Sequence, residues 1–262
     1  MNGRVKHKGE IQSVARALEI LQALGAARRD LSVTELAREM GVHKSTVSRL
    51  LSTLEAYRFV EQDRETGRFH LGYRISELSA ARFSRRDVRS MVRPFLEKLM
   101  ERSGEVVHLG ILDGGKAVYI DKVEGPHGLT LTSYIGRSVY AHCTALGKVL
   151  LAYMDPGRVR EIIQRVGLPA FTENTITDEA ELFQCLEQVR VRGYAIDDEE
   201  HERGVCCVAA PVCDAGGAVI AAISLSAPTV RISKKRLPEM IAMVKEAAEE
   251  ASRALGFVPI PA

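Results

Sequence analysis

The chain has no tryptophan, few aromatic residues and no apolar run long enough to cross a bilayer. A membrane-spanning helix needs about 20 mainly apolar residues, and the longest apolar stretch, around residues 218–227, is too short. The first ten residues are polar and lack the apolar segment of an export signal. We therefore expect a soluble, cytoplasmic protein that has no membrane partner.

Cysteine is also sparse, with five residues at positions 143, 185, 206, 207 and 213. Their number is odd and their spacing matches neither a disulfide framework nor a zinc motif, so reduced thiols are expected. The pattern indicates no cofactor, and a metal bound by Cys143, His201 or Cys207 is kept as an alternative. His142 and Asp197 could join Cys207 and His201 in a thiol-dependent hydrolase, but the spacing fixes no general base beside a nucleophile.

Neither sign of charge dominates the whole chain, because a basic front offsets an acidic rear. Residues 1–90 contain 17 Lys and Arg against 11 Asp and Glu, a net charge of +6. The remaining residues contain 19 against 23, a net charge of −4. This asymmetry predicts a polyanion partner, such as double-stranded DNA, for the front only.

The stretch over residues 32–54 has the spacing of two short helices joined by a sharp turn. Ser32 followed three residues later by Glu35 is a capping box, which predicts a helix that begins at Val33. Gly41 ends that helix, because glycine adopts the left-handed conformation common at helix C-termini. A second helix follows at once, and its buried stripe is Val47, Leu50, Leu51 and Leu54.

The polar face of this second helix is rich in hydrogen-bond donors. In helix-turn-helix proteins the N-terminal part of the second helix enters the major groove, where Arg and Lys suit guanine edges and Ser or Thr suit bases and phosphates. We predict DNA contacts from Thr34, Lys44, Ser45, Thr46, Ser48 and Arg49. The alternative is an ordinary helical hairpin whose polar face is only solvated.

A β-wing is predicted after the second helix. Residues 59–60 and 68–71 have strand character and are separated by a turn over 63–67. From this wing Arg64 and Arg68, together with His70, would reach phosphates or the minor groove. A preceding helix is expected to complete the small core with Val14, Ala17, Leu18, Leu21 and Leu24. The front is thus a winged helix-turn-helix.

The chain is longer than a winged helix needs, and its 46% hydrophobic content is enough for a second core. We predict a flexible N-terminus over residues 1–9, a DNA-binding domain over 10–72, a linker helix over 73–93, an effector-binding and oligomerisation domain over 94–257, and a tail over 258–262. Pro94 is expected in the first turn of the helix that follows the linker.

The pattern beyond the linker predicts an α+β domain with a mostly antiparallel sheet flanked by helices. Two hairpins are expected, one pairing 106–112 with 117–123 and one pairing 204–212 with 218–225, each around a glycine-containing turn. Helices are predicted up to Gly104 and over 144–154, 157–166, 179–192 and 234–255.

A few polar side chains interrupt this apolar pattern. Ser224 and Ser226 are two residues apart on a strand, so their hydroxyls point to the same face. Asp197 ends another strand, and Cys207 lies on the strand that pairs with the serine-bearing one. The first N–H groups of the helix over 144–154 would add donors and a favourable dipole for an anion. Such a set is typical of a small-ligand site, although each residue could instead have a merely structural role.

Four segments form a pattern that is more specific than a winged helix alone. They are 11–17 (IQSVARA), the helix-turn-helix, 142–148 (HCTALGK), and 192–200 (RGYAIDDEE) running on to Gly204 and 207–212 (CVAAPV). With them the chain resembles the IclR family of bacterial transcriptional regulators over nearly its full length. The resemblance implies a GAF-like second domain with a pocket for a small organic effector, often a carboxylate. It places in that pocket Ala145, Leu146, Asp197, Cys207, Ser224 and Ser226, and we add Val205 as a residue that sets the pocket's size.

The sequence therefore favours a ligand-responsive transcriptional repressor, not an enzyme, that acts as a homodimer or a dimer of dimers. One recognition helix contacts too few base pairs to find a genomic site, so a pseudo-palindromic operator is expected. The apolar faces of the first helix and the linker helix would form the dimer. Two alternatives are a constitutive DNA-binding regulator whose second domain only oligomerises, and an enzyme with an accessory winged helix.

Overall fold

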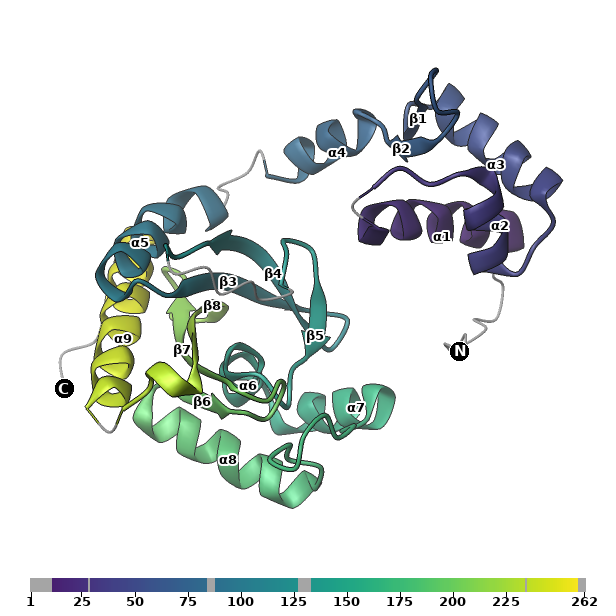
Figure 1. The fold of residues 1–262 in the computed structure, drawn as a ribbon. Coiled ribbons are helices and arrows are strands. Elements are labelled where there is room, and N and C mark those ends of the chain that lie inside the picture. The colour runs from purple at the N-terminus through teal and green to yellow at the C-terminus, as the bar shows by residue number, and fades with distance from the viewer. Residues whose placement is uncertain (1–10, 28, 84–87, 127–132, 234, 259–262) are drawn as a thin grey trace. The chain divides into compact units, whose positions relative to one another are not determined.

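The computed structural model describes residues 11–27, 29–83, 88–126, 133–233 and 235–258. The chain divides into two compact units, Met1–Arg86 and Asp87–Ala262, whose elements are labelled in Figure 1. The predicted N-terminal segment over 1–9 lies outside the described residues, as does most of the predicted tail.

The first unit contains a helix-turn-helix followed by a two-stranded wing. Its elements are α1 (Gln12–Ala27), α2 (Val33–Met40), α3 (Lys44–Ala56), β1 (Val60–Gln62), β2 (Phe69–Leu71) and α4 (Arg74–Phe83). Strands β1 and β2 are antiparallel, with Glu61 opposite His70. The predicted winged helix-turn-helix is confirmed.

The sharp turn between α2 and α3 has the predicted chemistry. The Ser32 side chain accepts a hydrogen bond from the Glu35 backbone N–H, and the Glu35 carboxylate accepts one from the Ser32 N–H at 2.8 Å. Such a cap stabilises a helix by about 1 kcal/mol. Gly41 ends α2 in the left-handed region, with φ of 65°. These two local features set the two ends of α2.

The core of this unit differs from the prediction on the side of α1. Ile20 and Leu24 are buried, whereas Val14 and Leu18, which the sequence placed in the core, are each 54% exposed. The helical repeat explains the difference, because the face through Leu24, Ile20 and Ala17 leaves the other two residues on the flank of the helix. Ile11 is exposed as well, so α1 presents an apolar strip to solvent.

The helix at the start of the second unit is longer than predicted. Helix α5 covers Val88–Ser103 and contains Pro94 in its interior, so the expectation that Pro94 lies in a first turn is wrong. The helix begins earlier because Val92, Leu96 and Leu99 form one buried stripe at helical spacing. The predicted linker end at residue 93 therefore falls inside α5.

The second unit is built on a six-stranded antiparallel sheet in the order β5-β4-β3-β8-β7-β6. The strands are β3 (Val106–Asp113), β4 (Lys116–Val123), β5 (Ser138–Tyr140), β6 (Ala195–Asp198), β7 (Val205–Cys213) and β8 (Val219–Pro228). Both predicted hairpins, β3-β4 and β7-β8, are confirmed. They meet through the pairing of β3 with β8 at the centre of the sheet.

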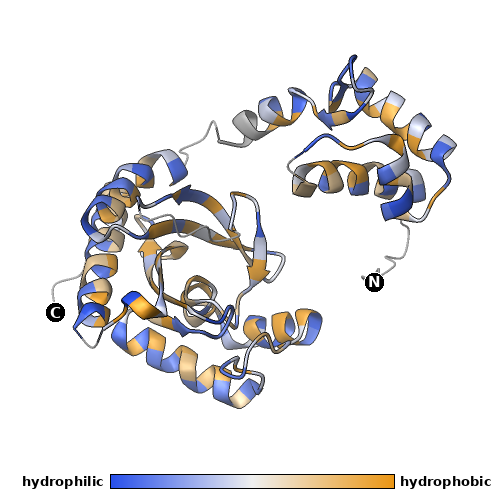
Figure 2. Ribbon diagram, viewed as in Figure 1, coloured by the Kyte–Doolittle hydropathy of each residue, from blue (hydrophilic) through white to orange (hydrophobic). Residues whose placement is uncertain are grey.

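Helices cover both faces of this sheet. One face packs on α5 and α9 (Arg236–Ala254), and the other packs on α6 (Ala145–Ala152), α7 (Pro156–Val166) and α8 (Glu179–Arg192). Hydrophilic and hydrophobic residues are interspersed along the outer helices α8 and α9, as amphipathic helices require (Figure 2). A short 3₁₀ turn, η1 (Thr229–Arg231), joins β8 to the segment before α9. No helix in the described ranges is both long and apolar enough to span a membrane.

The period-two pattern of the central strands assigns each side chain to one face. Val208, Ala210 and Val212 of β7 and Ile223, Leu225 and Ala227 of β8 belong to the core beneath α5 and α9. The alternate residues of the same strands face α6, and they include Cys207, Ser224 and Ser226. The polar residues of the second unit therefore gather on the α6 side of the sheet.

Candidate functional site

The predicted DNA-contacting residues of the helix-turn-helix are mostly exposed. Lys44, Ser45, Ser48 and Arg49 of α3 and Thr34 of α2 are exposed, and Thr46 is half-buried. The N-terminus of α3 is capped by His43, whose Nδ1 accepts a hydrogen bond from the Ser45 N–H at 3.3 Å. This cap was not predicted from the sequence. The Ser45 hydroxyl also lies 2.8 Å from the His43 Nδ1, whereas the exposed side chains of Lys44, Ser48 and Arg49 point to solvent.

The two predicted arginines of the wing lie in different settings. Arg64 is exposed in the turn between the strands. Arg68 donates a hydrogen bond from Nη1 to the Glu35 carboxylate at 2.9 Å and another to the Asp30 carbonyl at 3.0 Å. Hydrogen bonds from Ser32 and then Arg29, with the charge of Arg68, lower the pKa of Glu35 to about 2. Arg68 therefore ties the wing to the capped start of α2.

A small cavity of about 40 Å³ lies on the α6 side of the sheet. All seven residues predicted for an effector pocket line it: Ala145, Leu146, Asp197, Val205, Cys207, Ser224 and Ser226. The structure adds seven that the sequence analysis did not single out for it: His108, Tyr119, Ser133, Arg137, Thr144, His201 and Glu202. The cavity combines apolar walls with several hydrogen-bonding groups, as small-ligand sites do.

The floor of the cavity is a row of polar residues across neighbouring strands. Asp197 is opposite Cys207 in the β6-β7 pairing, and Cys207 is opposite Ser226 in the β7-β8 pairing. The Cys207 thiol donates a hydrogen bond to the Ser226 hydroxyl at 3.2 Å. Ser224, two residues along β8, is opposite His108 of β3. Both serines lie inside β8, so neither of them caps an end of the strand.

The roof of the cavity is the N-terminus of α6. Thr144 caps this helix, and its hydroxyl accepts a hydrogen bond from the Gly147 N–H at 3.2 Å. The N–H groups at the start of a helix have no acceptor within the helix and carry a partial positive charge. Those of Ala145 and Leu146 belong to residues that line the cavity. This end of the cavity can hold an anion.

Helix α6 approaches the preceding segment unusually closely. All eight of its residues are buried. A Cβ atom placed on Gly147 would lie 2.3 Å from the Cα atom of Ala141, closer than real Cβ atoms come to any atom. Glycine at this position is therefore what allows the first turn of α6 to form the roof.

Asp197 is the buried carboxyl group of the cavity, with only 3% of its surface exposed. Its Oδ1 accepts hydrogen bonds from the backbone N–H groups of Glu200 at 2.8 Å and His201 at 3.3 Å. Burial is the largest cause that raises the pKa of Asp197 to about 7, and the negative charge of Glu200 is the second. The carboxyl group can therefore exist in either protonation state near neutral pH.

This pKa predicts a particular dependence of stability on pH. The unfolded chain ionises Asp197 near pH 4, whereas the folded chain retains the proton up to about pH 7. The contribution of the Asp197 carboxyl group to the free energy of unfolding is therefore greatest below pH 4 and is lost as the pH rises to 7. Asp197→Asn keeps an acceptor oxygen but cannot ionise, so urea unfolding should show the wild type losing stability relative to this variant over that range. Parallel pH profiles would contradict the raised pKa.

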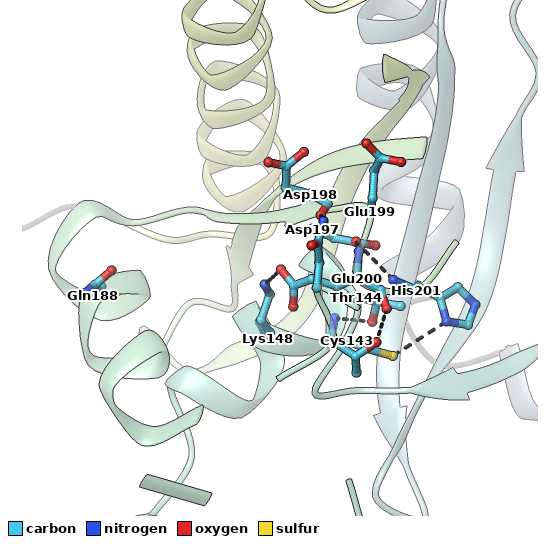
Figure 3. A network of polar contacts seen from close by, with 12 residues as sticks. Cys143, Thr144, Lys148, Gln188, Asp197, Asp198, Glu199, Glu200 and His201 are labelled. Atoms are coloured by element: carbon cyan, nitrogen blue, oxygen red, sulfur yellow. Dashed lines mark hydrogen bonds and ion pairs between the residues drawn. The ribbon is translucent and has the colours of Figure 1, made fainter. Parts of the chain in front are cut away.

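A buried ion pair lies beside the cavity. The Lys148 ammonium of α6 contacts the Glu200 carboxylate, and the two side chains are only 2% and 10% exposed (Figure 3). Burial raises the pKa of Glu200, and the attraction of Lys148 opposes this shift. The pair joins α6 to the residues that follow β6, the same segment whose backbone N–H groups bind Asp197.

Two residues of the metal alternative, Cys143 and His201, lie 3.6 Å apart from Sγ to Nδ1 (Figure 3). Burial raises the pKa of Cys143 to about 12, raises the pKa of Cys207, the cysteine of the hydrolase alternative, well above its usual value, and lowers the pKa of His201. A nucleophilic cysteine needs the opposite shifts, because the thiolate must be stabilised by a protonated neighbour. Within the described ranges, no three His, Cys, Asp or Glu side chains are grouped so as to hold a metal ion.

The seven cavity residues that were not predicted differ in how far the sequence could have indicated them. His108 occupies the alternate register to Val107 and Leu109 on a predicted strand, so period two could have placed it on the cavity face. Ser133 and Arg137 lie in the segment before β5, where no pattern foretold their position. Thr144 precedes the predicted Ala145, and His201 was named only for the metal and hydrolase alternatives; the fold shows that both residues line the cavity.

Comparison with known proteins agrees with this architecture. Residues 13–64 match the IclR helix-turn-helix domain, and residues 80–253 match the bacterial transcriptional regulator IclR C-terminal domain. The chain is 38% identical over 247 residues to the HTH-type transcriptional regulator XynR of Escherichia coli, a match that covers 94% of this chain and 98% of XynR.

Two solved structures show the same fold. The IclR of Thermotoga maritima is 35% identical, with a TM-score of 0.78 over 95% of this chain and 100% of that one. An IclR homologue from Microbacterium hydrocarbonoxydans, crystallised with 4-hydroxybenzoate, is 22% identical, with a TM-score of 0.82 over 93% of this chain and 98% of that one. This chain therefore belongs to the IclR family of transcriptional regulators.

Proposed function

We propose that the protein is a repressor that binds a pseudo-palindromic operator as a homodimer or dimer of dimers. A small carboxylate would lower or raise its affinity for this operator. The proposal that the second unit binds a small carboxylate effector rests on one cavity. This cavity combines the α6 N-terminus with Ser224, Ser226 and Asp197. A repressor is the simplest outcome of such binding, because a protein on its operator excludes other proteins from the same duplex.

The DNA part of the proposal rests on the exposed start of α3. Lys44 and Arg49 supply charge and bidentate donors for guanine edges, and Ser45, Thr46 and Ser48 supply hydroxyls. Thr34 and Arg64 would contact the sugar-phosphate backbone beside them. The net positive charge of residues 1–90 adds attraction that depends on salt but not on sequence.

The oligomeric part rests on the apolar strip of α1. Val14 and Leu18 of α1 and Ile11, just before this helix, are between 54% and 66% exposed. Burial of these apolar side chains against a second copy would remove them from water. Two copies related by twofold symmetry would present two recognition helices to two half-sites. This is the physical reason to expect a palindromic operator.

The small cavity and the helix N-terminus beside it favour a small, negatively charged ligand. A carboxylate at the α6 N-terminus would accept hydrogen bonds from the N–H groups of Ala145 and Leu146 and from the two serine hydroxyls. A protonated Asp197 could donate a further one. The Microbacterium homologue, which binds 4-hydroxybenzoate in its crystal, supports a small carboxylate as the class.

A thermal-shift screen tests the effector part. We expect at least one of acetate, propanoate, lactate, succinate, benzoate and 4-hydroxybenzoate to raise the melting temperature of the wild type, because a ligand that binds only the folded state stabilises it. The same acid should raise the melting temperatures of Ser224→Ala and Asp197→Ala less. If no acid stabilises the wild type, or all three proteins respond equally, the effector proposal fails.

Regulation would then follow from linkage between the two sites. An effector changes operator affinity only by the difference in its own affinity for the DNA-binding and non-binding states. The sign can be read directly by titrating labelled operator with protein at several concentrations of the stabilising acid. A constitutive regulator would show one operator affinity throughout.

Arg49 is expected to discriminate between operators. An operator is first selected from random duplexes with the wild-type protein, and binding is then measured by gel shift. Arg49→Ala should weaken binding by roughly 1–3 kcal/mol and relax base preference at one position of each half-site, because a bidentate contact to guanine is lost. Arg203→Ala, which removes an exposed arginine of the second unit, is the matched control.

Arg68→Ala provides a second comparison for Arg49. We expect it to weaken all sequences alike and to flatten the salt dependence, as loss of a phosphate contact does. Because Arg68 also binds Glu35, the folding of each variant is checked by circular dichroism. Unchanged operator binding by Arg49→Ala would mean that α3 is oriented differently on DNA.

A further inference from the structure

His108 stands out among the cavity residues because one of its ring nitrogens has no partner. The side chain is 2% exposed and lines the cavity from β3. Its Nε2 is 2.8 Å from the Ser133 hydroxyl, and within the described part of the chain its Nδ1 has no hydrogen-bond partner. A buried polar atom without a partner is costly, so its presence in a native structure requires an explanation.

The ring of His108 is uncharged. Burial, together with the positive charge of Lys122 on the neighbouring strand, lowers its pKa to about 3. At neutral pH the imidazole therefore offers one hydrogen-bond donor and one acceptor and no net charge. It suits a hydroxyl or carbonyl oxygen better than a second carboxylate.

The position of His108 relates it to the proposed carboxylate site. Ser224 is directly opposite His108 in the β3-β8 pairing. Adjacent strands are about 4.8 Å apart, so a carboxylate bound at Ser224 leaves the imidazole within reach of an oxygen a few bonds further along the ligand. The Tyr119 ring packs against the imidazole in a tilted arrangement, with centroids 4.6 Å apart and planes at 32°, and restricts its rotation.

We propose that His108 is a specificity-determining residue, which selects effectors that carry an uncharged oxygen, a hydroxyl or a carbonyl, near their carboxylate. The free Nδ1 is the group that binds this oxygen, while Nε2 remains on Ser133. This assignment rests on the proposed effector function and names a second subsite within the same cavity. An acid without such an oxygen would leave Nδ1 buried and unpaired.

Two variants separate this role from a structural one. His108→Gln places an amide near the position of Nε2, so it can keep the Ser133 contact but loses the group at Nδ1. His108→Asn has a shorter amide near the position of Nδ1, and this amide can donate or accept. If His108 only supported Ser133 and Tyr119, His108→Gln would be the milder change for ligand binding.

The test uses matched pairs of acids that differ by one hydroxyl: lactate with propanoate, 3-hydroxybutanoate with butanoate, and 4-hydroxybenzoate with benzoate. Affinities for the full-length protein are measured by calorimetry. For at least one pair, the wild type and His108→Asn should prefer the hydroxy acid by about tenfold, the effect of one well-placed hydrogen bond. His108→Gln should lose this preference while still binding the unsubstituted acid.

A second measurement observes the ring itself. With ¹⁵N-labelled histidine, the Nδ1 resonance of His108 should shift when the preferred hydroxy acid is added and should shift far less with its unsubstituted partner. If no acid in any pair binds, the effector proposal fails and this one with it. If acids bind but the wild type shows no hydroxyl preference, if His108→Gln keeps that preference, or if succinate binds more tightly than every hydroxy acid, only the His108 assignment is overturned.

Discussion

Replacing Gly147 with alanine is expected to lower the free energy of unfolding of the second unit by about 3 kcal/mol and to remove its response to effector. Alanine normally favours a helix over glycine by about 1 kcal/mol. Here the new methyl group would lie 2.3 Å from the Ala141 Cα atom and 2.4 Å from its carbonyl oxygen, and these backbone atoms cannot rotate aside. The first turn of α6 would have to move, and Ala145 and Leu146 would move with it.

The matched control is Gly25→Ala on α1. Gly25 is also a helical glycine, but the nearest atom to its added Cβ is 3.7 Å away, in ordinary contact. This variant should be neutral or more stable by about 0.5–1 kcal/mol. Urea unfolding compares the two variants, and a thermal-shift assay with the stabilising acid reports ligand response. A Gly147→Ala protein that unfolds at the wild-type urea midpoint would show that α6 is not tightly seated.

Replacing Lys148 with methionine is expected to cost about 3 kcal/mol of stability, because removing one partner leaves the other charge buried and uncompensated. Glu200 is the only carboxylate with which Lys148 is seen to pair in the described residues, and both side chains are almost inaccessible to water. The remaining Glu200 can escape the penalty only by taking up a proton, which raises its pKa further. The loss should therefore be smaller at pH 5 than at pH 8, since a raised carboxyl pKa favours the folded state only at low pH.

A surface pair provides the control for Lys148. Lys98 contacts Glu250 at 2.8 Å, but the lysine is about half exposed, so Lys98→Met should change stability by about 1 kcal/mol or less at either pH. The double variant Lys148→Met with Glu200→Gln should recover part of the loss, because no charge then remains buried. Equal effects of Lys148→Met and Lys98→Met would contradict the burial of the pair.

Local chemistry made much of this structure predictable. Ser32, Glu35 and Gly41 determine the ends of α2 through hydrogen bonds and a backbone angle that involve only nearby residues. Strand alternation placed Ser224 and Ser226 on one face, and the resemblance to a known family assigned Ala145, Leu146, Asp197 and Cys207 to the same pocket. The ends of α2 and the placement of these residues around one cavity were predictable because each depends on short-range geometry or on segments shared with that family.

The features that escaped prediction depend on packing between distant parts of the chain. Val14 and Leu18 are as apolar as Ile20, and only the docking of α1 on its neighbours decides which of them is buried. Pro94 is tolerated inside α5 although proline usually disrupts a helix interior. Arg137 reaches the cavity from an irregular segment, and neither periodicity nor capping assigns such a residue to a site.

The joint between α5 and β3 has a mechanical consequence. Only Gly104 and Glu105 separate the two elements. Arg231, just beyond the serine-bearing strand β8, binds the Glu105 carboxylate at 2.7 Å, and Arg236 at the start of α9 donates to the Ser103 carbonyl at 2.6 Å. If the cavity binds a ligand as proposed, a shift of β8 would be passed through these two contacts to the C-terminal end of α5, the helix that begins the second unit.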